Sequence, residues 1–112
     1  MKILLVKPKK RPEIVDIDGS LESMQQVVGG LIQLIYPFPD EPDIALICND
    51  EGKLLGLPTS RILIDDRFSV IDVIAGSFFL CGAPAESENL ESLPEEKLAE
   101  YQAVFSFPFV QV

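Results

Sequence analysis

The residue types that most often perform catalysis are scarce in this sequence. There is no histidine, which removes the commonest general base and metal ligand and the partner of Ser-His and Cys-His pairs. The two cysteines, Cys48 and Cys81, are too widely spaced for a Cys-x-x-Cys redox or zinc motif. We therefore predict no catalytic residue, no metal and no cofactor, and we expect the protein not to be an enzyme.

Both cysteines lie in apolar, strand-like runs. A free cysteine in such a run packs as a small hydrophobic residue. We predict two reduced thiols in the core, and a disulfide between neighbouring strands is the alternative.

Carboxylate pairs are the remaining groups with catalytic potential, and the closest in sequence are Asp16 with Asp18 and Asp65 with Asp66. An Asp-x-Asp pair presents both carboxylates on one side for magnesium only if the strand continues through it. Asp18 precedes a glycine and a serine that are typical of a turn. A carboxylate- and magnesium-dependent hydrolase is therefore the least favoured function.

Arg61 is the most suggestive polar residue, because it follows an irregular Gly/Pro-containing segment and precedes an apolar strand in a chain with few cations. A guanidinium in that position suits an anion or a partner protein, whereas a structural ion pair with Asp65 or Asp66 is the alternative. Gly29 and Gly30 are expected to end the first helix as its C-cap, and the alternative, in which glycines let a ligand approach the backbone, completes the candidate binding site. Its residues are Arg61, Ser60, Gly29, Gly30, Gly56 and Pro58.

The composition describes an acidic globular chain. Apolar residues make up 47% of the 112 residues, which supports a packed core, and the net charge is −9. Four of the nine cations lie within residues 7–11, where Pro8 and Pro12 favour a solvated loop. Because the remainder is strongly acidic, we expect neither nucleic-acid nor membrane binding.

The sequence also predicts a cytoplasmic location. The apolar start of the chain is followed by the basic loop, at the position where a signal peptide would have its small-residue cleavage site. No apolar run approaches the roughly 20 residues that span a bilayer.

Hydrophobic periodicity and turn residues predict a single α+β domain over residues 1–112. We expect a small mixed, mainly antiparallel sheet with one short N-terminal helix at residues 21–28 and one C-terminal amphipathic helix at residues 93–105. Ser92 and Glu95 are spaced as a capping box for the second helix. Residues 44–48 and 53–55 are expected to form a hairpin around residues 49–52. The other expected strands are residues 2–6, 13–17, 31–36, 61–64, 70–74 and 77–81, the last two of which could be one kinked strand.

The tail after the second expected helix is unusually apolar, with Phe107, Phe109 and Val110. Such a segment either packs on its own sheet or covers a neighbouring molecule. We expect the second outcome and predict a homodimer.

Several runs in succession resemble an uncharacterised family, domain of unknown function 3846, of bacteriophages, plasmids and other mobile elements. They are Asp18-Gly19-Ser20-Leu21-Glu22, Val28-Gly29-Gly30, Cys48-Asn49-Asp50-Glu51-Gly52-Lys53-Leu54, Gly56-Leu57-Pro58 with Arg61, and Asp72-Val73-Ile74-Ala75-Gly76-Ser77-Phe78-Phe79. Family members commonly carry asparagine before the arginine, and Ser60 departs from that pattern. The resemblance implies no established activity, but it implies an origin among mobile elements, where antagonists of host defence are common.

These observations favour a non-enzymatic binding or accessory protein of a bacteriophage or mobile genetic element, which would bind a protein or a small ligand and could antagonise host defence. An acidic DNA mimic that inhibits restriction enzymes is the alternative. The acids are distributed through turns and the last expected helix, instead of along one long element, which counts against mimicry of a phosphate track.

Overall fold

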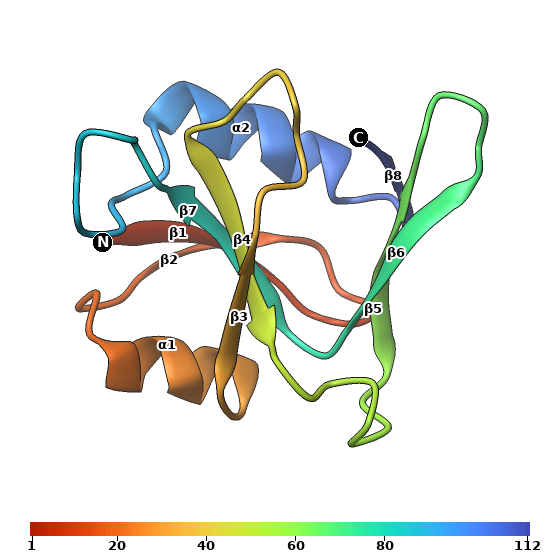
Figure 1. Cartoon of the computed structure of the whole chain (residues 1–112), viewed down its shortest axis with the longest axis horizontal. Helices are drawn as coiled ribbons and strands as arrows, with labels where there is room; N and C mark the ends of the chain where they lie inside the picture. The colour runs from red at the N-terminus through yellow and green to blue at the C-terminus, as the bar shows by residue number, and fades with distance from the viewer.

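Two β-sheets organise the computed structural model, which describes residues 1–112. A five-stranded antiparallel sheet has the order β2-β1-β7-β4-β3, and a three-stranded sheet has the order β6-β5-β8 (Figure 1). In the small sheet, β5 is antiparallel to β6 and parallel to β8. The strands are β1 (Lys2–Val6), β2 (Glu13–Asp16), β3 (Ile32–Ile35), β4 (Ile44–Asn49), β5 (Thr59–Ile64), β6 (Val70–Ala75), β7 (Phe78–Gly82) and β8 (Phe109–Gln111).

Two helices lie on opposite sides of the five-stranded sheet, α1 (Leu21–Val28) and α2 (Glu95–Val104) (Figure 1). Helix α1 begins where Ser20 accepts a hydrogen bond from the Ser23 amide at 3.0 Å, and it ends at Gly29, whose φ is 79°. A serine N-cap and a left-handed glycine are the expected start and stop of a short helix. The bounds predicted for the first helix are therefore confirmed.

The apolar core forms on both faces of the large sheet, because its central strands alternate their side chains between the two faces. The larger cluster joins the sheet to α2 and to the small sheet through residues such as Phe105, Leu63 and Val110. The smaller cluster packs Met24 and Val28 of α1 against the opposite face. The predicted α+β fold with a mainly antiparallel arrangement is confirmed.

Strands β6 and β7 belong to different sheets, so they are not one kinked strand. The chain crosses between the sheets at Gly76, which has a φ of 82° and donates its amide to the Pro58 carbonyl at 2.7 Å. A Cβ at Gly76 would lie 2.8 Å from Leu57 Cδ1. Glycine is therefore needed at this crossing both for its backbone conformation and for the close approach.

The predicted hairpin of residues 44–48 with residues 53–55 is wrong. Strand β4 instead pairs with β3 and β7, which occupy both of its edges. Residues 53–55 form turns, and Leu54 and Leu55 are exposed. The turn residues at 49–52 were recognised correctly, but the preceding strand β3 and the buried strand β7 are the partners of β4.

The predicted capping box at Ser92 is also wrong. Helix α2 begins at Glu95 after Pro94, which makes no side-chain cap. The Ser92 hydroxyl instead accepts a hydrogen bond from the Lys2 amide at 2.8 Å. Ser92 therefore joins the segment before α2 to the start of β1.

The apolar tail pairs with its own chain. Strand β8 adds to β5, and Val110 enters the large core cluster. Phe107 and Phe109 remain largely exposed. The tail thus packs on its own sheet and still leaves two aromatic side chains at the surface.

Neither helix is long and apolar enough to cross a membrane.

Both cysteines are free and buried, as predicted. Cys48 belongs to the cluster under α2 and Cys81 to the cluster under α1, so they lie on opposite faces of the large sheet. Burial, with a smaller contribution from Asp72 and Asp50, raises the pKa of the Cys48 thiol to about 11, and burial raises the pKa of Cys81 to about 12.

We predict that neither thiol of the native protein reacts with a thiol-specific reagent at about pH 8, because only the thiolate attacks. Both thiols should react once denaturant unfolds the chain. Since the folded pKa values exceed the ordinary value of 9.0, burial of the neutral thiols favours folding below that pH. This contribution should be lost as the pH rises towards the folded values. Rapid reaction of one thiol in the folded protein would contradict this account.

Candidate functional site

Arg61 lies inside the molecule, where its guanidinium donates hydrogen bonds to four backbone carbonyls. Its side chain comes from β5, and the residue is only 4% exposed. Nε donates to the Phe105 carbonyl at 2.7 Å, and Nη2 donates to Lys10 at 2.6 Å. Nη1 donates to Ser60 at 2.7 Å and to Lys7 at 3.3 Å. One side chain therefore joins β5, the end of α2 and the loop between β1 and β2.

The carbonyl of Phe105 explains why a cation is favourable at this position. Phe105 is the C-cap of α2, where the last helical carbonyls lack intrahelical partners and carry the negative end of the helix dipole. The last turn of α2 contains no basic residue of its own. Arg61 supplies that positive charge from another element of the fold.

The ion pair considered for Arg61 does not form. None of the ion pairs of the chain includes Arg61, Asp65 or Asp66. Burial lowers the pKa of the Arg61 guanidinium from its ordinary value. The ordinary pKa of arginine is so high that the group still stays charged. Carbonyl dipoles therefore balance the buried charge in place of a carboxylate.

The loop that Arg61 holds forms one wall of a cationic hollow of about 360 Å³. The exposed residues Lys9, Lys10 and Arg11 line this wall, and no acidic residue lines the hollow. The opposite wall comes from β5 and from the segment that leads to β8. The full lining is Lys9, Lys10, Arg11, Thr59, Ser60, Arg61, Ile62, Ser106 and Pro108.

Ser60 carries an unsatisfied polar group in this lining. The residue is 5% exposed, and its hydroxyl Oγ has no hydrogen-bond partner. A buried hydroxyl without a partner costs free energy, so it points to a ligand or an ordered water. A guanidinium has five N–H donors, and the carbonyls use four of those on Arg61. The lining of the hollow thus includes three exposed cations and two buried residues, Ser60 with an unpartnered hydroxyl and Arg61 with one remaining guanidinium donor.

The other residues of the predicted binding site lie elsewhere. Gly29 and Pro58 line a separate hollow of about 350 Å³ beside Pro8. Gly30 lies against Asn49, and Gly56 adopts a φ of 69° with open space where a side chain would be. The structure therefore brings Ser60 and Arg61 together and separates them from the glycines.

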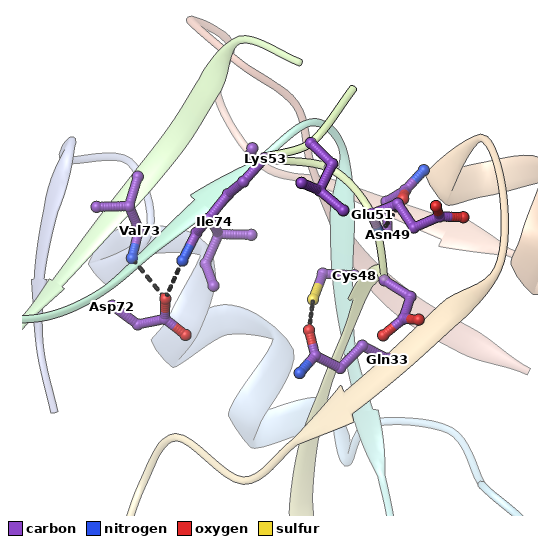
Figure 2. A pocket seen from close by; sticks show the side chains of 12 residues that line it. Gln33, Cys48, Asn49, Glu51, Lys53, Asp72, Val73 and Ile74 are labelled. Atoms are coloured by element: carbon purple, nitrogen blue, oxygen red, sulfur yellow. Dashed lines mark hydrogen bonds and ion pairs between the residues drawn. The ribbon is translucent and has the colours of Figure 1, made fainter. Parts of the chain in front are cut away.

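A further hollow, of about 260 Å³, lies between the end of β4 and β6 (Figure 2). Lys53 and Asp72 form an ion pair of 2.9 Å on one side of it. On the other side, the Cys48 thiol lies 3.8 Å from the Gln33 Oε1 atom, to which it donates. The one cation of this hollow, Lys53, is thus already paired, Asp50 and Glu51 add further negative charge to the lining, and the thiol has a raised pKa. No group of three or more cysteine, aspartate or glutamate side chains in the chain is placed to hold a metal ion.

The comparison with protein families identifies one match. The family model described as domain of unknown function (DUF3846) matches residues 1–106. The chain belongs to this family. No curated protein matches the sequence, and no solved structure matches the fold. Strand β8 lies beyond the part of the chain that the DUF3846 model covers.

Several of the runs that resemble DUF3846 make structural links. Asn49 Nδ2 donates to the Val28 carbonyl at the end of α1 at 3.1 Å, and Asn49 Oδ1 accepts from the Glu51 amide at 2.8 Å. A Cβ at Gly30 would lie 3.0 Å from Asn49 Nδ2, and one at Gly52 would lie 2.8 Å from the Ala75 carbonyl oxygen. In this member of DUF3846, these residues join α1, β4 and β6.

Sequence reasoning missed Lys9, Lys10 and Arg11 as site residues, because a basic loop between prolines is usually a solvated connection. The available signal was their concentration in an otherwise acidic chain. The missing information was the contact with Arg61, which lies about fifty positions further along the chain.

We predict that Arg61→Ala lowers the free energy of unfolding by about 3 kcal/mol or more, because the substitution leaves buried carbonyls without donors. Arg61→Lys should recover part of this loss, since an ammonium cannot reach all four carbonyls. Chemical denaturation measures both effects. The control is Arg67→Ala, which removes an exposed arginine and should change stability by less than about 0.5 kcal/mol. Equal stability of the two alanine variants would show that Arg61 is not a structural link.

Proposed function

We propose that this protein is a non-enzymatic binding protein whose cationic hollow takes a small ligand bearing a phosphate group. The observation that supports this most directly is a hollow lined by Lys9, Lys10 and Arg11 without an acidic residue, beside Ser60, whose buried hydroxyl has no partner. Phosphate oxygens accept hydrogen bonds from hydroxyl, ammonium and guanidinium donors, and charge strengthens those bonds.

The charge distribution favours an anion at this place. The chain carries 18 acidic residues and 9 basic ones, so most of its surface repels anions. Four of the nine basic residues, the exposed Lys9, Lys10 and Arg11 and the buried Arg61, line one hollow without an acidic neighbour in the lining. A concave surface of one charge focuses the electric field and raises the local concentration of oppositely charged ligands.

The backbone around the hollow is held in place before a ligand arrives. Arg61 binds the carbonyls of Lys7 and Lys10 and thereby fixes the loop that carries the exposed cations. Preorganised donors bind an anion with less entropic cost than a flexible basic segment. A hollow of about 360 Å³ also lies within the range of small-ligand sites, about 300–1,000 Å³.

The groups in the hollow are suited to binding. Lysine and arginine side chains at the surface are cationic at neutral pH, and a serine needs a neighbouring base to act as a nucleophile. The lining supplies donors and positive charge but no such base. Ligand binding alone is the activity that this set of side chains supports.

We propose a cytoplasmic accessory role in a bacteriophage or other mobile genetic element. Membership of DUF3846 and the resemblance of its runs to proteins of mobile elements support that context. A protein that sequesters a phosphate-bearing signal molecule of the host would be a direct way to antagonise host defence.

We predict that inorganic phosphate and pyrophosphate bind saturably at millimolar or lower concentration and low ionic strength. In a titration followed by ¹⁵N–¹H NMR, the amides of residues 9–11 and 59–61 should shift, while those of the hollow near Lys53 should not. Added salt should weaken binding because it screens the cations.

Ser60→Ala separates ligand binding from folding. Removal of an unpartnered hydroxyl should leave stability unchanged or slightly increased, whereas the affinity for phosphate should fall by about tenfold. Lys10→Ala should weaken phosphate binding, and the matched control Lys2→Ala, at an exposed lysine on β1, should not. Absence of shifts around the hollow, or equal effects of the two lysine substitutions, would refute the proposed site.

A further inference from the structure

The small sheet buries one face and exposes apolar side chains on the other side. Leu63, Ile74 and Val110 enter the large core cluster. By contrast, Phe68 is 78% exposed and Phe109 is 55% exposed. These two rings border a hollow of about 420 Å³ that is also lined by Ile64 and Gln111.

The backbone at Phe68 is unusual for an aromatic residue. Its φ is 63°, in the left-handed region. The Asp65 amide donates to the Ser69 carbonyl at 2.9 Å, so residues 66–68 form a three-residue turn of which Phe68 is the last. This position favours glycine. A bulky side chain in this conformation costs about 1–2 kcal/mol. Asp65 accepts hydrogen bonds from the amides of Arg67, Phe68 and Ser69, so the turn fixes the exposed ring of Phe68 in this conformation.

The exposed apolar area is large for a small protein. It comprises side chains of the β5–β6 turn, the start of β6 and the tail. From their exposed fractions and about 150–250 Å² for an aromatic side chain, the area is roughly 500 Å². Covering it on two copies would bury about 1,000 Å², the lower limit for a specific interface. The contributing residues are Phe68, Val70, Ile71, Phe107 and Phe109.

The charges at the two ends of β5 have opposite sign. The strand begins beside the loop of Lys9, Lys10 and Arg11. It ends at Asp65 and Asp66, which outnumber the one nearby cation, Arg67. Figure 1 shows the loop after β1 near one end of the small sheet and the β5–β6 turn at the other end. A twofold axis that sets two β5 strands antiparallel would bring each basic end onto the acidic end of the partner.

We propose that this apolar face, defined by Phe68, Val70, Ile71, Phe107 and Phe109, binds a second copy of the same chain as a symmetric dimer. A twofold interface needs a surface that complements itself. The antiparallel arrangement satisfies this condition in charge and covers the apolar side chains of both copies.

The test is sedimentation equilibrium of the full chain at micromolar concentration, where the mass should be twice the 12.4 kDa of one chain. Phe68→Asn should raise the dimer dissociation constant by about a hundredfold, because each dimer loses two buried rings. Asparagine tolerates the left-handed conformation, so this variant should fold as well as the parent. Asp66→Lys should also weaken the dimer, because it places like charges together.

The control is Leu54→Ser, which removes the most exposed of the large apolar side chains, at 86%, from a turn outside this face. Its dissociation constant should equal that of the parent. A monomeric parent protein would overturn the proposal. A dimer that Phe68→Asn leaves intact would also overturn it, and an unchanged dimer with Asp66→Lys would overturn the antiparallel arrangement.

Discussion

The arrangement of this protein depends on one buried cation. Arg61 donates to carbonyls of the β1–β2 loop, of its own strand and of the end of α2. These segments are distant in sequence, and backbone carbonyls that leave water must find donors. A guanidinium is the one side chain with enough donors in a fixed geometry to satisfy several of them at once. The small sheet is therefore attached to the rest of the molecule by polar contacts as well as by the shared core.

The same contacts create the cationic hollow. By holding the carbonyls of Lys7 and Lys10, Arg61 determines the course of a loop whose side chains repel one another. The rest of the chain is acidic, and the positive charge is concentrated in this loop. Structure and proposed function are thus linked, since the residue that stabilises the loop also positions the cations that would bind the ligand.

Local sequence signals predicted the parts of the fold that local interactions decide. Helix α1 was predicted within its observed bounds because Ser20 and Gly29 cap it through neighbouring residues. The strand predicted at residues 53–55 failed because β4 finds its partners in β3 and β7. The cap predicted at Ser92 failed because its hydroxyl binds the amide of Lys2, ninety positions away.

The candidate site shows the same division. Arg61 and Ser60 were recognised as unusual from their context. However, the Arg61 side chain is buried by contacts with the loop at Lys10 and with the end of α2. Both segments are distant in sequence, so the residues next to Arg61 do not predict its burial. The exposed ring of Phe68 was missed for a related reason. An aromatic residue that follows a run of charged residues gives no sequence signal of the sheet face beside which it lies.

The most direct test of this account is hydrogen exchange of the arginine Nε–H groups in the native protein, observed by ¹⁵N–¹H NMR. Arg61 should give a protected Nε–H signal, because that group is buried and bonded to the Phe105 carbonyl. The exposed arginines Arg11 and Arg67 should exchange rapidly under the same conditions. If Arg61 exchanged as fast as those two residues, the guanidinium would be in water, and the central role assigned to it would be contradicted.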